Sequence, residues 1–449
     1  MVSDSVSSPN VVMISPSSPT PPHLRNLQLS FLDQLSPPMY IHIILHFDSS
    51  HSQIKINDDN LRRSLSEALA VYYPLAGRLR DGLSSVDCND AGAEYVEAHF
   101  PASRISDVIQ TAHPEDLRQY VPAAPSGGAD IPLAVQVSFF AGGGLAIGVC
   151  LSHRIADATS MVMFISTWAA ACRADAGAVA AAQPSFSSAS RFPPADFSRF
   201  FPSVAAPPPP PPAEKIITRR FVFNKWKVSA LRQAASGPLM ASPATRVEAV
   251  SAFLWRHFIE SAVTSKDKKQ AFAATHAVDI RRRASPPLPR HYFGNACARA
   301  MAVTESPASE FGGYYELVLK LRETISKADS RYVGRLENGD EFLTYYSENE
   351  ENDPTFRDGS KTLEICSFTS WHRLPGYEVD YGWGKPAWVS IMEVPLKNLI
   401  FLLGTKSGDG IEAWVNMREE DMAAIKTHYD LLQTVEDMEK HKNFNLSVN

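Results

Sequence analysis

The spacing of hydrophobic residues early in the chain predicts a helix with one buried face. Leu61, Leu65 and Leu69 recur about one helical turn apart, which places them on the same side of an α-helix. Pro74 follows shortly afterwards, and a proline disfavours helical geometry in the residue before it. We therefore expect this helix to end before Pro74.

Two apolar runs farther along predict a pair of strands followed by a helix. Residues 133–140 and 145–151 are rich in hydrophobic side chains and are separated by a glycine-rich turn, a pattern typical of paired strands. Residues 158–173 have the apolar spacing of a buried helix, and Asp157 precedes them as a preferred N-cap residue. His153 thus lies between a buried strand and a helix.

The second half of the chain mixes the same two kinds of element. Thr245 and Glu248 form a capping-box pattern before an amphipathic helix. Residues 397–417 predict a hairpin with two glycines in its turn, and residues 419–438 predict a C-terminal amphipathic helix. Because strands and helices alternate in both halves, the fold class is α/β.

The chain of 449 residues is too long for one compact core, so two domains are expected. Residues 174–215 are rich in Ala, Ser and Pro and include six consecutive prolines at 207–212, which favour an extended path. We predict an N-terminal domain over 1–173, a linker over 174–215 and a C-terminal domain over 216–449.

Composition and charge exclude several classes of function. A net charge of −6 without a basic block argues against a nucleic-acid partner. The N-terminus lacks the basic and apolar regions of a signal peptide, and no stretch is apolar enough to span a membrane, so we expect a cytoplasmic protein. The five cysteines are scattered, and no metal-ligand motif occurs, so no metal is expected.

His153 is the leading candidate for a catalytic residue. Of the 13 histidines, only His153 has an aspartate four residues later, Asp157. A free imidazole has a pKa of about 6.5 and therefore suits a general base. Without a Gly-x-Ser-x-Gly motif, such a base would act directly on a substrate hydroxyl or amine. The residues alone leave two hypotheses: a catalytic pair, or a hydrogen-bonded core histidine beside a helix cap.

A second candidate is the stretch DYGWGKP at residues 380–386. Two glycines around a tryptophan indicate a tight loop. Such a loop is either a structural turn between strands or a place where a ligand approaches the backbone.

Taken together, seven motifs resemble the plant BAHD family of CoA-dependent acyltransferases. They are, in chain order, LSFLDQL, YYPLAGRL, SHRIADATS, TRVEAVSAFLWR, DIRRRASPPLPRHYFGNA, SFTSWHRLP and VDYGWGKP. Tyr381 stands where the family has phenylalanine. Ser152 and Ala158 differ from the related condensation domains, which carry a second histidine and a glycine there. The likeness covers nearly the whole chain.

The resemblance implies a two-domain, chloramphenicol-acetyltransferase-like fold. Each domain is a mixed β-sheet flanked by helices, with an active-site channel at the domain interface. Acyl-CoA, as a co-substrate rather than a bound cofactor, and a small-molecule alcohol would meet at His153. This histidine would deprotonate the hydroxyl, which then attacks the thioester. Family members are usually monomers, so a monomer is expected.

The same resemblance assigns roles to residues outside the His-x-x-x-Asp motif. Thr369 and Trp371 would donate hydrogen bonds to the oxyanion, although Trp371 could instead serve core packing. Asp157 would pair with Arg281 and hold the shape of the site. Asp380 and Trp383 would brace the channel.

The resemblance also implies contacts with the donor. Lys385, together with the basic runs 281–283 and 266–269, could attract the CoA phosphates. Ser251 and Gly382 could lie along the pantetheine arm. The motifs look most like the branch that acetylates hydroxyls of alkaloids and terpenoids, so acetyl-CoA is the first expected donor and a hydroxycinnamoyl donor the second. A non-catalytic binding protein and a thioester hydrolase remain as rival hypotheses.

Overall fold

The computed structural model describes most of the chain. The described residues are 9–48, 57–80, 85–122, 125, 128, 130–195, 214–237, 240–262, 270–305, 313–350, 362–394 and 396–446. The prolines at 207–212 and the basic run 266–269 lie outside them.

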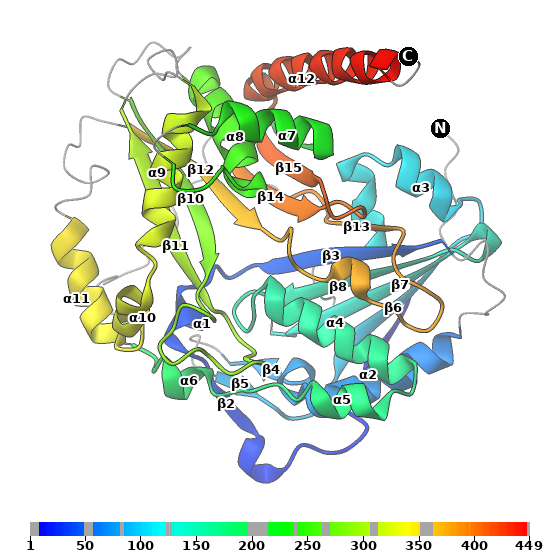
Figure 1. Ribbon diagram of the computed structural model, residues 1–449. Helices are drawn as coiled ribbons and strands as arrows, with labels where there is room; N and C mark the ends of the chain where they lie inside the picture. The colour runs from blue at the N-terminus through cyan, green and yellow to red at the C-terminus, as the bar shows by residue number, and fades with distance from the viewer. Residues whose placement is uncertain are drawn as a thin grey trace.

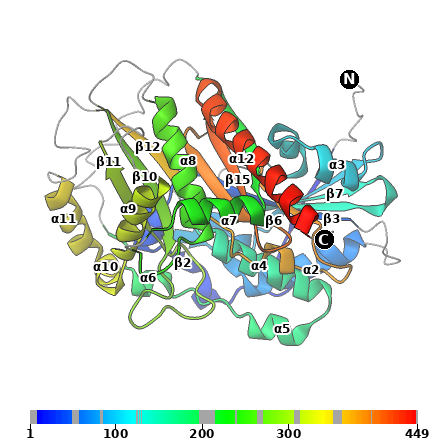
Figure 2. The same cartoon turned by 45° about the horizontal axis from the view of Figure 1, so that its top comes forward.

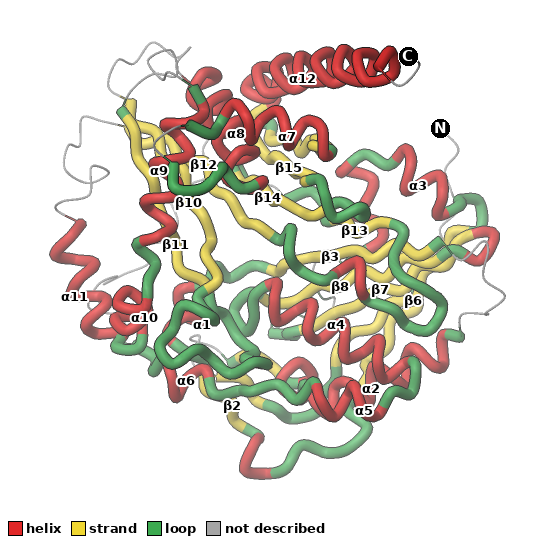
Figure 3. The backbone as a smooth tube through the Cα atoms, viewed as in Figure 1, coloured by secondary structure: helices red, strands yellow, loops and turns green. Residues whose placement is uncertain are grey.

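Two six-stranded mixed sheets form the framework (Figure 1). The first has the order β1 (Asn10–Ile14), β6 (Ala93–Phe100), β7 (Leu133–Phe140), β8 (Leu145–Ser152), β3 (Tyr40–Phe47) and β13 (Trp388–Ser390). The second has the order β11 (Cys297–Thr304), β10 (Gln270–Asp279), β12 (Thr362–Ser370), β14 (Leu399–Gly404), β15 (Ile411–Arg418) and β9 (Ile216–Phe223). Both halves of the chain contain helices as well as strands (Figure 3), which confirms the α/β class.

The remaining elements are a small sheet and the helices. The small sheet holds β2 (Asn26–Gln28), β5 (Ser85–Asp87) and β4 (Arg78–Leu79). The helices are α1 (Phe31–Leu35), α2 (Asp58–Val71), α3 (Ile105–Thr111), α4 (Ala158–Cys172), α5 (Ala176–Ala181), α6 (Ser188–Arg191), α7 (Lys225–Ala234), α8 (Arg246–Ala262), α9 (Tyr314–Ser326), α10 (Ser330–Leu336), α11 (Gly339–Glu350) and α12 (Glu419–Leu446).

The hydrophobic patterns predicted these elements correctly where they were strongly periodic. Helix α2 buries Leu61, Leu65 and Leu69, and the predicted strand pair is the antiparallel pair β7–β8. The capping box before α8 is present: Thr245 N donates to Glu248 Oε2 at 2.8 Å, and Glu248 N donates to Thr245 Oγ1 at 3.2 Å. The C-terminal hairpin is β14–β15.

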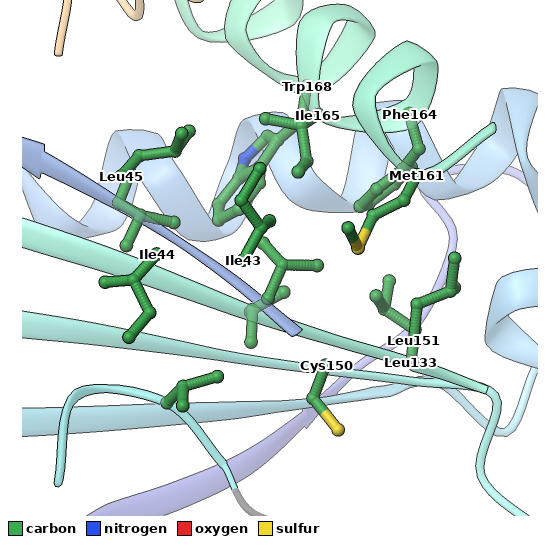
Figure 4. Close-up of a cluster of buried hydrophobic side chains, with 14 of the residues drawn as sticks. Ile43, Ile44, Leu45, Leu133, Cys150, Leu151, Met161, Phe164, Ile165 and Trp168 are labelled. Carbon is green, nitrogen blue, oxygen red and sulfur yellow. The ribbon is translucent and has the colours of Figure 1, made fainter. Parts of the chain in front are cut away.

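The core of the first sheet lies under α4. Figure 4 shows Met161, Ile165 and Trp168 of this helix facing the strands β3 and β8. Trp168 is fully buried, and its indole N–H donates to Leu61 O at 3.1 Å, so the largest side chain of the interface leaves no unpaired donor. This packing fixes α4, and with it the turn that precedes the helix.

The second half of the chain also contributes to the first sheet. Strand β13 pairs antiparallel with β3, with Trp388 opposite His46, and Trp371 and Tyr381 belong to the hydrophobic cluster of the first sheet. The first sheet is therefore completed by a strand that lies, in sequence, between β12 and β14 of the second sheet.

Residues 174–195 are less extended than a simple linker, since they contain α5 and α6. A parallel bridge joins Ser185 to Tyr292. Among the described residues, none of the helices combines the length and apolarity required to cross a membrane.

Candidate active site

The turn between β8 and α4 holds two candidate residues in fixed positions. Strand β8 ends at Ser152, and the backbone N–H of His153 donates to Met39 O at 2.8 Å. Asp157 caps α4 by accepting a hydrogen bond from Ser160 N at 3.0 Å. The backbone is thus held at both ends of the turn.

The ring of His153 is oriented by an asparagine from the second half of the chain. Its Nδ1 lies 3.0 Å from Asn295 Oδ1, while Asn295 Nδ2 donates to His153 O at 2.8 Å. Because the amide oxygen can only accept, the neutral imidazole must carry its proton on Nδ1. Nε2 of the partly buried ring then keeps its lone pair, as a general base requires.

Asn295 is itself held by a buried carboxylate. Its backbone N–H and its Nδ2 both donate to Asp33 Oδ1, at 3.0 and 2.8 Å. Asp33 also accepts from the backbone N–H and the hydroxyl of Ser30, in the capping box of α1. Burial raises the pKa of Asp33, and these hydrogen bonds oppose that rise. A chain of hydrogen bonds therefore runs from His153 through Asn295 to Asp33.

Asp157 points into a different network. Arg281 NH1 and NH2 donate to Asp157 Oδ2 and Oδ1, both at 2.9 Å, and Ala296 N donates to Oδ2 at 3.0 Å. Burial alone would raise the pKa of Asp157, but the guanidinium charge and the hydrogen bonds outweigh it and lower the pKa below its usual value. Bidentate pairing of this kind fixes both partners geometrically.

The structure therefore separates the two residues of the His-x-x-x-Asp motif. His153 contacts Asn295, and Asp157 contacts Arg281. Sequence reasoning missed Asn295 and Asp33, although both stand in the quoted motifs HYFGNA and LSFLDQL. They are 262 positions apart, so no spacing rule could pair them.

Thr369 and Trp371 lie at the end of β12, where the two sheets meet. The indole N–H of Trp371 donates to Thr369 Oγ1 at 3.2 Å, so this N–H is already engaged and only the threonine hydroxyl proton is free to point elsewhere. The ring of Trp371 packs edge-on against Phe401, with centroids 5.5 Å apart.

A pocket of about 290 Å³ opens beside Trp371. Its apolar walls come from both sheets: Ile43 of β3 and Val389 of β13 on one side, and Leu403 of β14 on the other. Arg373, Lys406 and the acidic Glu378 contribute charged groups to its lining.

The DYGWG stretch is a tight loop at the far end of α4. Gly382 and Gly384 adopt φ of 108° and 111°, which a side chain would strain, and Asp380 Oδ1 accepts their N–H groups at 2.8 and 3.0 Å. Trp383 stacks on the buried Tyr381 at 5.3 Å. Arg173, the residue after the end of α4, donates a hydrogen bond from its guanidinium to the backbone carbonyl of Asp380.

Helix α4 has 15 residues and is therefore about 22 Å long. Since Arg173 and Asp157 flank opposite ends of it, the DYGWG loop lies on the order of 20 Å from the His153 turn. Asp380 and Trp383 thus stabilise a loop that is remote from His153.

The residues expected to bind CoA are placed in different surroundings. Ser251 is fully buried on α8, and its hydroxyl has no hydrogen-bond partner within the described part of the chain. Lys385 is exposed and pairs with Glu378 at 2.5 Å. Arg281 is committed to Asp157, so it is not free to attract phosphates. Gly382 is exposed in its loop.

His153 is held by Asn295 from the second half of the chain, in a molecule built on two mixed sheets, and this arrangement is compatible with an enzyme of two-sheet α/β architecture. The comparison with family models agrees: residues 5–432 match the Transferase family. The chain belongs to this family, the BAHD acyltransferases.

Named relatives support the same assignment. Stemmadenine O-acetyltransferase of Catharanthus roseus is 39% identical over 94% of this chain and 96% of its own length. Vinorine synthase of Rauvolfia serpentina is 37% identical over 92% and 94%, and its crystal structure matches with a TM-score of 0.76. The structure of F. sporotrichioides TRI101, at 19% identity and a TM-score of 0.66 over 88% of this chain and 96% of that one, shares the fold.

Proposed function

We propose that this protein is an acyl-CoA-dependent O-acyltransferase in which His153 is the general base. The observation that carries the proposal is the hydrogen bond from His153 Nδ1–H to Asn295 Oδ1, which leaves Nε2 as the basic atom. In an acyltransferase without a protein nucleophile, a base of this kind acts on the acceptor itself.

The reaction then proceeds by direct transfer. Nε2 of His153 removes the proton of the acceptor hydroxyl as its oxygen attacks the thioester carbonyl. The tetrahedral oxyanion collapses, the C–S bond breaks, and the CoA thiolate takes up the proton held by His153. The ring ends neutral and ready for the next turnover.

We assign the oxyanion contact to the hydroxyl of Thr369. Trp371 N–H donates to the threonine oxygen, which polarises the O–H bond and orients its proton away from the indole. In this arrangement Trp371 acts through Thr369 rather than on the oxyanion itself, and its ring closes the pocket.

The CoA phosphates are assigned to the charged side of the pocket. Arg373 and Lys406 are exposed there. Burial is the main cause that lowers the pKa of the neighbouring His372 to about 4, with smaller contributions from the charges of Arg373 and Arg246. In a protein of net negative charge, anion binding requires such a local concentration of cations. Weaker CoA binding by Lys406→Ala, against unchanged binding by the surface control Lys426→Ala, would support this position.

Acetyl-CoA is the proposed donor, and a hydroxyl of a plant alkaloid, terpenoid or phenolic is the proposed acceptor. Stemmadenine O-acetyltransferase and limonoid O-acetyltransferases at 32–39% identity support this choice. A hydroxycinnamoyl donor is the alternative, since the TSWHRLP segment resembles hydroxycinnamoyltransferases.

The test is thiol release from acetyl-CoA and from a hydroxycinnamoyl-CoA, with a panel of alkaloid, terpenoid and phenolic alcohols. We expect release that depends on one class of alcohol and is matched by ester formation. CoA release that no alcohol accelerates would indicate a thioester hydrolase. CoA binding without turnover would indicate a binding protein.

A further inference from the structure

A cluster of metal-ligating side chains lies outside the candidate active site, between helices α8 and α12. His257 Nδ1 is 2.6 Å from Glu260 Oε2, and His428 Nε2 is 3.9 Å from the same oxygen. The three ligand atoms lie within 4.8 Å of one another. Helix α12 crosses the surface beside α8 (Figure 2), so the cluster joins these two helices.

The remaining polar atom of each side chain has its own partner. His428 Nδ1 lies 2.9 Å from Ala424 O, so this nitrogen carries the proton and Nε2 keeps its lone pair. Arg256 Nε donates to Glu260 Oε1 at 3.1 Å, which leaves Oε2 to face the histidines. Tyr314 Oη is 3.3 Å from His257 Nε2. Partners of this kind orient the ligands of metal sites.

We propose that His257, Glu260 and His428 form a binding site for a divalent transition metal, with zinc as the best-matched ion. Two imidazole nitrogens and one carboxylate oxygen are a known zinc ligand set, with water in the fourth position. Glu260 and His428 are partly exposed, at 29% and 40% of their side chains, so an ion can enter from solvent.

Binding requires the side chains to move: the rings of His257 and His428 are stacked, with centroids 3.8 Å and planes 19° apart, and must tilt so that both nitrogens face one ion. Ligand atoms around tetrahedral zinc lie about 3.3 Å apart. The hydrogen-bonded pair His257–Glu260 must therefore widen, while Glu260 and His428 must approach. The proton that His257 Nδ1 shares with Glu260 passes, through solvent, to Nε2, where Tyr314 Oη can accept it. The ring remains neutral throughout.

A bound ion would fasten α12 to α8 and stabilise the packing of these helices on the second sheet. The predicted function is structural, because His153 belongs to the turn before α4 on the first sheet, whereas α8 and α12 cover the second (Figures 1 and 2). Acyl transfer should therefore continue when the site is altered.

The test uses the full chain, purified without a polyhistidine tag and stripped of metal, with zinc binding measured by calorimetry. We expect one ion per chain and a higher unfolding temperature with zinc. His428→Ala should bind zinc at least about tenfold more weakly and lose the temperature shift, while acyl transfer is retained. Glu260→Gln serves as the second variant should His428→Ala fold poorly.

The matched control is His99→Ala. His99 forms an exposed pair with Glu97 at 2.8 Å and is not part of the three-ligand group, so this variant should bind zinc like the parent. Absence of binding in the parent, or equal binding in His428→Ala, would overturn the proposal. A thiolate charge-transfer band with cobalt would also overturn it, by locating the ion on a cysteine.

Discussion

His153 and Asp157 stand four residues apart, yet their surroundings are opposite in kind. His153 is partly exposed and hydrogen-bonded to a neutral amide. Asp157 is only 4% exposed and forms a bidentate ion pair with Arg281. The first environment leaves a nitrogen lone pair available for chemistry. The second environment engages both carboxylate oxygens of Asp157 and connects the turn to Arg281 in the second half of the chain.

The contrast teaches why the aspartate is not the orienting partner of the histidine. A buried carboxylate already neutralised by a guanidinium is held in place, because each charge would be left uncompensated without the other. A neutral asparagine can orient the ring without adding a charge next to it. Asn295 thus occupies the position that an aspartate has beside the histidine of a triad, and Asn295 is hydrogen-bonded in turn to Asp33.

Asp157→Ala should give the largest effect, on stability. Removing one partner of a buried ion pair costs about 3–5 kcal/mol, because Arg281 remains buried without its counter-charge. Urea unfolding should show this loss. The double variant Asp157→Leu/Arg281→Met, which removes both charges, should recover part of it. If Asp157→Ala unfolded at the same urea concentration as the parent, the ion pair with Arg281 would not stabilise the fold as claimed.

Thr369→Val should lower kcat by about 10²–10³-fold, the usual effect of removing one oxyanion donor. Thr369→Ser keeps the hydroxyl and should stay near the parent rate. Steady-state kinetics with a saturating donor separates the two. Equal rates for the Val and Ser variants would exclude the hydroxyl from the transition state.

Asn295→Ala should lower kcat by about 100-fold, the usual effect of misplacing a reacting group, while the KM for the acyl donor changes little. The pH dependence of kcat should change as well, because the ring of His153 loses its fixed tautomer. Asn60→Ala is the control, since Asn60 bonds Cys172 O at the other end of α4; it should affect stability alone. An unchanged pH profile in Asn295→Ala would reduce Asn295 to a packing residue.

The smallest effect concerns acid stability. The pKa of Asp157 is lowered in the folded state, whereas an aspartate in an unfolded chain titrates near about 3.9. The unfolded chain therefore binds this proton first as the pH falls, and the contribution of Asp157 is full above pH ~4 and lost below it. The difference in unfolding free energy between the parent and Asp157→Asn should be constant near neutral pH and shrink below pH ~4. A difference that widens in acid would contradict the lowered pKa.

The sequence predicted the strongly periodic elements because local patterns determine them. The helix of Leu61, Leu65 and Leu69, the strand pair before His153 and the capping box of Thr245 all follow from neighbouring residues. The place of β13 in the first sheet could not be predicted in this way. That pairing joins Trp388 to His46, which are far apart in the sequence.

The candidate site could likewise be predicted only where local sequence determines it. His153 stood out by its spacing and its place after a strand. Asn295 and Asp33 are recognisable only when the fold brings α1 and the segment before β11 together.

The most direct test of the central claim is the turnover of His153→Ala, measured beside its unfolding curve. Loss of a general base should lower kcat by at least about 10²–10⁴-fold, while the unfolding free energy stays close to that of the parent, since a partly exposed, neutral ring is removed. Turnover equal to that of the parent, in a folded variant, would contradict the assignment of His153 as the base.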